Sequence, residues 1–229
     1  MTQRWCIPAE QNAAFVAAME DVLDVYARVP DPARPLVCFD EAGKELQDHV
    51  RPPSPLAPGY VAREDSEYRR QGRATLFCWW APHLGGRQVG VTSQRTKQDW
   101  AEAMRTLVDD VFPEAERIVL VLDNLNTHTP GALYATFPPD EAKRIWDKLD
   151  LHYTPKHGSW LNMAELELSA LARQCLRRRI PDQVTLAAEV AAWAKERHAA
   201  GLRLHWTFTT TAARTKLSHL YPIPEQDND

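Results

Sequence analysis

Hydrophobic residues follow two different spacings along the chain. Short apolar runs bounded by turn residues or charges predict strands at residues 36–40, 73–80, 88–93, 117–123 and 150–154. Apolar residues three or four positions apart predict helices at residues 8–28, 96–111, 139–148, 161–177 and 183–200. The order is a helix, three strands and then alternating helices and strands, which predicts an α/β fold.

Turn and cap residues support these boundaries. Gly85 and Gly86 predict a tight turn between the second and third strands, so the first three strands should form a meander. Asp182 and Gly201 are residue types that begin and end helices, which fits the helix at 183–200. Residues 52–59 include four prolines, so we expect an exposed loop without regular structure there.

The bulk composition is that of an ordinary globular protein. Of 229 residues, 44% are hydrophobic and 25% are charged, which allows one sizeable core and argues against disorder. No apolar run approaches the ~18 residues that a membrane span needs, and the N-terminus has no signal-peptide pattern. We therefore expect a cytoplasmic protein. Its four cysteines are far apart, which favours reduced core thiols over disulfides or a zinc site.

The net charge is slightly acidic. The chain has 27 basic and 31 acidic residues, for a net charge of −4, whereas an isolated DNA-binding domain is usually basic. Basic residues nevertheless cluster at 177–179 and at 68–73. Either run is consistent with a solvated face or with a patch that binds phosphate.

Three acidic residues suggest a metal site. Asp40 and Asp123 end buried strands, so their carboxylates can lie side by side at one edge of the sheet, while Glu41 points to the opposite face of its strand. Glu165 lies in the helix predicted at 161–177. Clustered carboxylates are costly without cations, and hard oxygen ligands favour Mg²⁺ or Mn²⁺ over zinc. Two such ions are a common means of cutting and joining phosphodiesters.

These acids belong to a series of five short motifs. In chain order the motifs are Asp40-Glu41, Asp123-Asn124 followed by His128, Gly-Ser-Trp-Leu-Asn-Met-Ala-Glu at 158–165, Trp-Thr-Phe-Thr-Thr at 206–210, and a last segment at 213–222. Together they resemble the catalytic domain of mariner-like bacterial insertion-sequence transposases of the DDE superfamily. The resemblance covers roughly residues 35 to 222.

The resemblance implies both a fold and an activity. The fold would be ribonuclease H-like, with a mixed five-stranded sheet flanked by helices. The activity would be DNA strand cleavage and strand transfer at TA targets, with Asp40, Asp123 and Glu165 as catalytic residues that hold two Mg²⁺ or Mn²⁺ ions. The implied partners are duplex DNA, as element ends and target, and a second copy in a homodimer. In related transposases an insertion at the position of residues 52–59 contacts the partner subunit or its DNA.

Other residues near these motifs would bind DNA or support the metal ligands. His128 would touch the scissile phosphate or hold a ligand, and the loop at 155–159 would contact phosphate at the positive end of the following helix. The full set is Asn124, His128, Lys156, His157, Ser159, Asn162, Arg177, Arg178 and Arg179.

The choice between Glu165 and Glu167 depends on the resemblance. A helical wheel places both on the flanks of the apolar stripe of their helix, so periodicity does not separate them. The family's Asn-x-x-Glu pattern falls on Asn162 and Glu165 and therefore selects Glu165.

The sequence predicts three regions. Residues 1–35 would be an N-terminal helix and linker, residues 36–180 the catalytic domain, and residues 181–229 a helical extension. Mariner-like transposases carry a helix-turn-helix region ahead of this domain, so we expect a truncated frame, a trimmed piece or half of a split protein. The alternatives to a transposase are a non-catalytic remnant that binds DNA or dimerises, and a structure-selective nuclease.

Overall fold

The computed structural model describes residues 7–8 and 10–223, so Cys6 and both extreme termini lie outside the described residues. The elements are α1 Ala13–Tyr26, β1 Leu36–His49, β2 Tyr68–Ala81, β3 Gly86–Thr92, α2 Lys97–Thr106 with a π turn at Leu107–Val111, β4 Ile118–Leu122, α3 Pro130–Thr136, α4 Pro139–Asp147, β5 Leu149–Tyr153, a 3₁₀ turn at Ser159–Leu161, α5 Ala164–Gln174, α6 Gln183–Ala199, α7 Thr210–Lys216 and a 3₁₀ turn at Ser218–Leu220.

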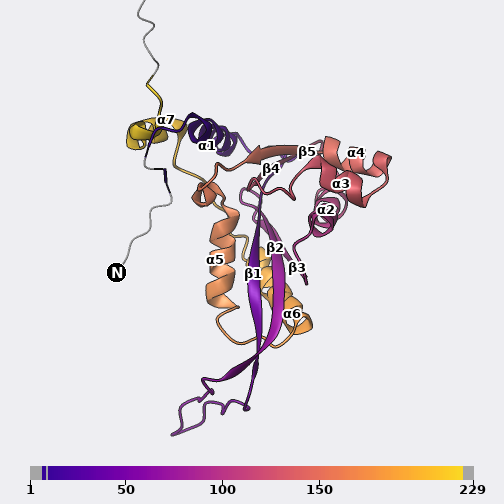
Figure 1. Ribbon diagram of the computed structural model, residues 1–229, viewed down its shortest axis with the longest axis vertical. Helices are drawn as coiled ribbons and strands as arrows, with labels where there is room; N and C mark the ends of the chain where they lie inside the picture. Colours follow the sequence, from indigo (N-terminus) through magenta and orange to yellow (C-terminus); the bar gives the residue numbers. More distant parts are fainter. Residues whose placement is uncertain (1–6, 9, 224–229) are drawn as a thin grey trace, which may run out of the picture.

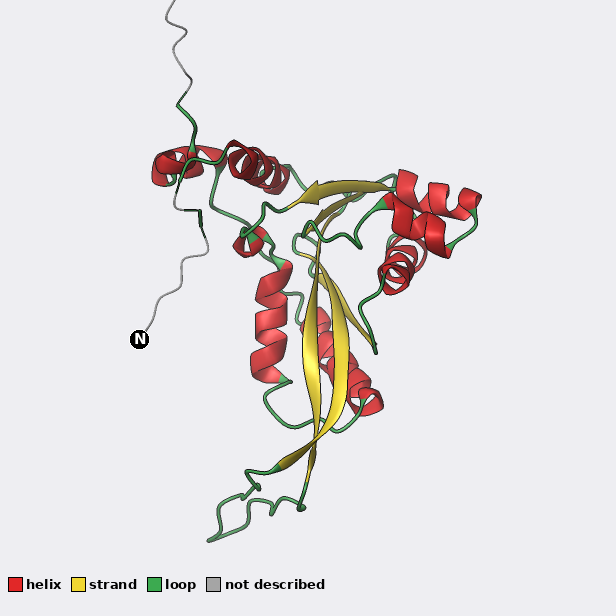
Figure 2. Cartoon of the chain, in the orientation of Figure 1, coloured by secondary structure: helices red, strands yellow, loops and turns green. Residues whose placement is uncertain are grey.

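The five strands form one mixed sheet in the order β3-β2-β1-β4-β5 (Figure 1). β1, β2 and β3 are antiparallel neighbours, whereas β1 pairs parallel with β4 and β4 pairs parallel with β5. Helices flank the sheet (Figure 2). The predicted meander, α/β class and ribonuclease H-like fold are confirmed.

Alternate residues of β1 enter different apolar cores. Val37 and Phe39 pack on the face covered by α2, α3 and α4. Leu36 and Cys38 pack on the other face, with α1 and the start of α5. On that same face, α5 and α6 cover β2 and β3. Because side chains alternate along a strand, the residue after Phe39 continues toward α5 and the next one toward α2.

The first two strands are much longer than predicted. β1 continues to His49, which pairs with Tyr68 of β2, and the register shifts between Glu45 and Gln47. The extension is rich in polar residues, so it lacks the apolar run that marks a strand. Helices α3 and α7 were not predicted, since seven residues are too few to show a clear stripe. The helix predicted from 161 begins only at Ala164, after the 3₁₀ turn.

The loop between β1 and β2 extends from the body of the molecule (Figures 1 and 2), and we call residues 50–67 the arm. It contains isolated bridges between Ser54 and Arg63 and between Ala57 and Tyr60. Leu56 and Tyr60 are 77% and 73% exposed. The exposed loop predicted at 52–59 is confirmed.

Two further expectations concern cysteines and membranes. Cys38 and Cys78 are free and buried, and Cys175 is free and half-buried. Within the described part of the chain, no helix is long and apolar enough to cross a membrane.

Candidate active site

Asp40 and Asp123 occupy equivalent places on neighbouring strands. β1 and β4 run parallel, and Cys38 lies opposite Val121. Two residues further along each strand are Asp40 and Asp123, so both carboxylates leave the sheet at the same edge.

Asp40 is buried among other negative charges. It is 9% exposed, and burial raises its pKa to about 7, while the charges of Glu165, Asp123 and Glu41 act in the same direction. The backbone N–H of Glu41 donates a hydrogen bond to Asp40 Oδ1 at 2.8 Å and opposes this rise in pKa. A cation at this position would favour the ionised form of Asp40.

Asn162 fixes the start of α5 against β1, the strand that contains Asp40. Its Nδ2 donates to the carbonyl oxygen of Phe39 at 2.8 Å, and its Oδ1 accepts from the backbone N–H of Ala164 at 3.1 Å. Asn162 is 1% exposed, so its side chain does not contact a ligand and instead holds the backbone around the acids in place. The first turn of α5 contains the half-buried Glu165.

Glu167, the other acid of α5, is bound by two arginines. Arg197 of α6 donates from Nε and Nη2 to its two carboxylate oxygens at 3.0 and 2.8 Å. Arg87 Nε of β3 lies 3.3 Å from Glu167 Oε2, and the side chains of Arg87 and Glu167 are 0% and 3% exposed. Glu167 thus joins β3, α5 and α6, whereas Glu165 contributes to the charge around Asp40.

His128 lies buried between two acids. Its Nε2 is 2.9 Å from Glu41 Oε1, and its Nδ1 is 3.0 Å from the backbone carbonyl oxygen of Asp123. Its ring stacks on Trp100 with centroids 5.5 Å apart. Burial disfavours the charged imidazolium, but the hydrogen bonds to Asp123 and Glu41 outweigh it and raise the pKa of His128 to about 9. His128 therefore holds the end of β4 against Glu41 on the face opposite Asp40.

The donor set at this edge suits a hard divalent cation. Glu41, Asp123 and His128 offer atoms within 4.8 Å of one another, but both ring nitrogens of His128 already have partners. Glu41 Oε2 is buried without a hydrogen bond among the described residues, whereas Asp123 Oδ1 lies 3.0 Å from His128 Nδ1, which also contacts the Asp123 backbone carbonyl oxygen. Carboxylate oxygens that lack donors are the ligands that Mg²⁺ and Mn²⁺ prefer.

A cavity of about 400 Å³ lies beside Asp123 and brings together four of the other predicted site residues. It is lined by Asn124, Lys156, His157 and Ser159 among others, and these four are exposed. His157 has a φ of 67°, and a Cβ on Gly158 would lie 2.5 Å from Pro155 Cγ. The loop thus has a tight backbone that requires glycine at 158 and presents polar side chains to the cavity.

The three arginines after α5 have different surroundings. Arg179 is committed to the arm: its Nε lies 2.9 Å from Glu64 Oε1, its Nη1 donates to the Glu67 carbonyl at 3.0 Å, and its side chain is 13% exposed. Arg178 is exposed and pairs with Glu189, and Arg177 is exposed. Arg179 therefore holds the arm to the body, whereas Arg177 and Arg178 lie at the surface.

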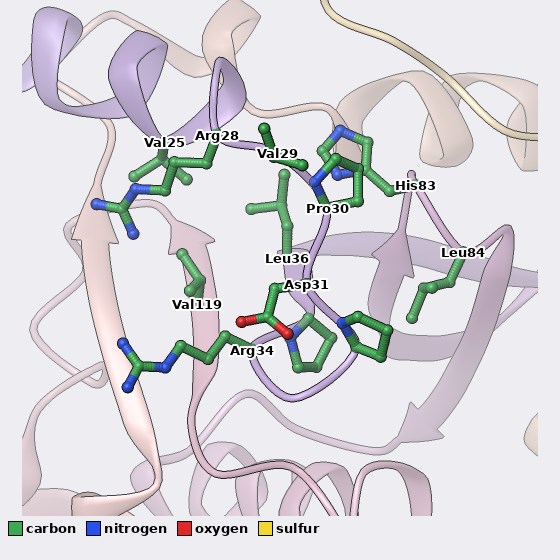
Figure 3. Close-up of a pocket in the computed structure, with 12 residues that line it drawn as sticks. Val25, Arg28, Val29, Pro30, Asp31, Arg34, Leu36, His83, Leu84 and Val119 are labelled. Carbon is green, nitrogen blue, oxygen red and sulfur yellow. The ribbon is translucent and has the colours of Figure 1, made fainter.

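Another cavity, of about 370 Å³, lies away from these acids (Figure 3). It is lined by Val25 of α1, by the linker with Arg28, Asp31 and Arg34, and by Leu36 and Val119. Leu36 and Val119 begin or nearly begin their strands, whereas Asp40 lies further along β1 and Asp123 follows the end of β4. The cavity is thus separate from the edge of the sheet where Asp40 and Asp123 lie, which we call the acidic edge.

Comparisons with known proteins agree with this geometry. The profile of the family described as DDE superfamily endonuclease matches residues 35–187. Solved structures of the Mos1 mariner paired-end complex with Mn, the Mos1 strand transfer complex and the mariner Mos1 paired-end complex with Mg are similar in fold. The first is 17% identical with a TM-score of 0.55 and covers 88% of this chain and 62% of that chain. The second is 18% identical with a TM-score of 0.58 and covers 88% and 61%. The third is 18% identical with a TM-score of 0.58 and covers 97% and 67%.

The chain spans about three fifths of the length of the first of these structures. A comparison with curated proteins found no match. At these identities the solved structures establish the fold, while the family profile covers well over half of the chain. The chain therefore belongs to the DDE superfamily endonuclease family.

Proposed function

We propose that this chain is the catalytic domain of a transposase, which cuts DNA at the ends of a mobile element and joins the ends to a target. One observation carries the proposal: Asp40 and Asp123 each lie two residues beyond the paired Cys38 and Val121 of the adjacent parallel strands β1 and β4, and the charge of Glu165 acts on the buried Asp40. Membership of the DDE superfamily endonuclease family supports it, and so does the likeness in fold to Mos1 complexes that contain Mn or Mg.

The three acids would hold two Mg²⁺ or Mn²⁺ ions. Such ions, when bound, activate an attacking oxygen and stabilise charge on the leaving oxygen. Around them, His128 keeps Asp123 in place, Asn162 keeps α5 against β1, and Lys156 and Ser159 bind phosphate beside Asp123.

The reaction would have two steps. Water attacks a phosphodiester at the element end, the bond from phosphorus to the 3′-oxygen breaks, and a 3′-hydroxyl is released. That hydroxyl then attacks a target phosphodiester in-line and displaces another 3′-oxygen. The family resemblance favours TA as the target, a step that deforms easily.

The proposed partners are duplex DNA and a second copy of the chain. The Mos1 structures named above are paired-end and strand transfer complexes, which supports DNA as the substrate. The arm exposes Leu56, Tyr60 and Val61 away from the body, so it offers an apolar contact to the partner subunit or its DNA.

The test uses a labelled duplex from the ends of the element that encodes the chain, together with a plasmid target. With Mn²⁺ or Mg²⁺ we expect a nick at the element end and joined products, and EDTA should abolish both. Cleavage without joining would instead indicate a structure-selective nuclease. DNA binding without cleavage in either metal would indicate a non-catalytic remnant.

A further inference from the structure

A cavity of about 340 Å³ lies on the Glu41 face of β1, next to the candidate active site. Its floor consists of small residues of the β1–β2 hairpin, including Gly43 and Thr75, and its cationic residues are Arg73 and Arg95. Glu41, which lines one end, is also the residue that contacts His128. The cavity therefore adjoins the acidic edge from the face opposite Asp40.

Arg73 is directed into this cavity and not toward its cross-strand acid. Glu45 lies opposite Arg73 in the register of β1 and β2, yet Glu45 pairs with Arg70 at 3.5 Å. Arg73 instead lies over Gly43, because its Nη2 is 3.2 Å from the position that a Cβ would take there. Within the described residues, Arg73 has no carboxylate within ion-pair distance.

Arg95 approaches the same cavity from the loop between β3 and α2. Its Nη1 is 3.9 Å from Glu41 Oε2, too far for a hydrogen bond, and its side chain is 52% exposed. The carboxylate of Glu41 already has His128 as a partner at 2.9 Å. Two guanidinium groups thus face the cavity without a hydrogen-bonded anion between them.

We propose that Arg73 and Arg95 form a phosphodiester subsite that holds the DNA backbone beside the active site. The inference rests on the proposed function, because it takes duplex DNA as the ligand. Guanidinium groups suit phosphate oxygens, with which they form paired hydrogen bonds, and the small residues leave space for the phosphate. Contacts to phosphate position a duplex without reading its sequence, so the subsite sets the register of DNA across the acidic edge.

The test is duplex binding measured by fluorescence anisotropy over a range of salt concentrations, without divalent metal. Each phosphate contact contributes about 0.9 to the slope of log K against log salt. Arg73→Gln and Arg95→Gln should each flatten the slope by about that amount, and the double variant by about twice as much. Arg70→Gln is the matched control, since it removes the same charge from the same strand outside the cavity and should leave the slope nearly unchanged. A double variant with the wild-type slope, or a control that loses as much, would overturn the subsite.

Gly43→Ala tests the geometry without removing a charge. The added Cβ would crowd Arg73 Nη2 at 3.2 Å and move the guanidinium. We expect weaker DNA binding in the Gly43→Ala protein, and no further loss when the same change is made in the Arg73→Gln protein. Equal losses in both backgrounds would mean that Arg73 is not the group displaced.

The outcomes separate this subsite from the proposed catalysis. Salt-dependent DNA binding that requires Arg73 and Arg95, without metal-dependent cleavage, would support the subsite and contradict the assignment as a transposase. If the wild type cleaves DNA and the variants show the wild-type salt dependence of binding, the assignment as a transposase would be supported and the subsite would be contradicted. A wild-type protein that binds no duplex DNA would overturn both.

Discussion

Two buried carboxylates on the α5 side of the sheet have opposite electrostatic surroundings. Glu167 lies against Arg87 and Arg197, which neutralise it. Asp40 lies near Glu165, Asp123 and Glu41, and among the described residues no arginine or lysine pairs with it. Burial of an acid alone is therefore no sign of a functional site, because an acid paired with cations can serve to connect elements. A buried acid such as Asp40, which has other acids as neighbours and no paired cation, is the better sign, because its ionised form calls for a cation from outside the chain.

Activity gives the largest expected difference between these settings. Glu165→Gln should lower metal-dependent DNA cleavage by roughly three orders of magnitude, about 4 kcal/mol in barrier. Glu167→Gln should leave cleavage within about tenfold, or 1.4 kcal/mol, at a temperature at which both variants are folded. Single-turnover cleavage of a labelled duplex provides the measurement. The reverse order would move the catalytic acid two residues along α5.

The free energy of unfolding should be more sensitive to a change at the paired acid, Glu167, than to a change at the unpaired acid, Asp40. Glu167→Gln removes one member of a buried ion cluster and leaves two arginines uncompensated, so it should cost about 3–5 kcal/mol. Asp40→Asn removes charge repulsion from the apo protein and should not lower its stability. Urea unfolding in EDTA measures both. A strongly destabilised Asp40→Asn protein would show that the Asp40 carboxylate makes favourable contacts in the folded protein, contrary to the repulsion expected from the neighbouring acids.

Metal binding should stabilise only the uncompensated cluster. An ion that binds the folded state at 100 times its Kd adds about 2.7 kcal/mol, so Mg²⁺ or Mn²⁺ should raise the Tm. Asp123→Ala should remove most of this rise, whereas Glu167→Gln should keep it despite a lower starting Tm. Thermal unfolding with and without metal tests this. An undiminished metal response in the Asp123→Ala protein would exclude Asp123 from the site.

The sequence predicted the fold where residues follow a local pattern. The sequence placed Asp40 and Asp123 together by assuming that both end a strand, but β1 continues to His49, and it is the pairing of Cys38 with Val121 that brings the two acids level. The outer halves of β1 and β2 were not predicted, because they are rich in polar residues and are stabilised by pairing with each other. Periodicity also could not separate Glu165 from Glu167 and needed the Asn162 motif. The motif has a physical reason, since Asn162 bonds the Phe39 carbonyl.

Contacts between distant segments were beyond prediction. Glu41 and His128 are separated by 87 positions and Glu167 and Arg197 by 30, and nothing in either local sequence signals the pairing. Arg179 was grouped with its neighbours by composition, yet the arm occupies its guanidinium. The local sequence identified residues that could bind a metal ion or phosphate. The packing of the folded chain determines which of them already have partners within the protein.

A change at the Glu41–His128 contact should have a smaller effect on metal binding at the acidic edge. Glu41→Gln should weaken the hold on His128 and lower metal affinity, by about 10–100-fold if it behaves as other groups that support ligands. His152→Asn is a suitable control, since His152 is also a buried histidine but bonds Asp21, 2.7 Å away. Mn²⁺ titration of both proteins gives the comparison. Equal losses in affinity would point to general loosening of the fold.

The smallest expected effect belongs to Glu20, a half-buried acid that is fully paired with the exposed Arg214. Arg214 Nε and Nη2 donate to the two carboxylate oxygens of Glu20 at 2.8 Å each, and Tyr221 Oη donates to the same carboxylate at 2.8 Å. The hydrogen bond from Arg214 lowers the pKa of Glu20 below its usual 4.5. A lowered pKa means that the folded state favours the ionised form, so this stabilisation is present above the unfolded pKa and is lost as pH falls through the folded one.

Glu20→Gln should therefore lower stability slightly at neutral pH, and the difference from wild type should shrink below about pH 4.5, where the wild-type carboxylate gains its proton. Added salt should also reduce the difference, since the Arg214 side chain is 62% exposed and its charge is screened. Chemical unfolding of the two proteins at pH 7 and pH 3, at low and high salt, measures this. A difference that grows as pH falls would contradict the direction of the pKa shift. A difference as large as that for Glu167→Gln would mean that burial adds little to the contribution of a paired acid to stability.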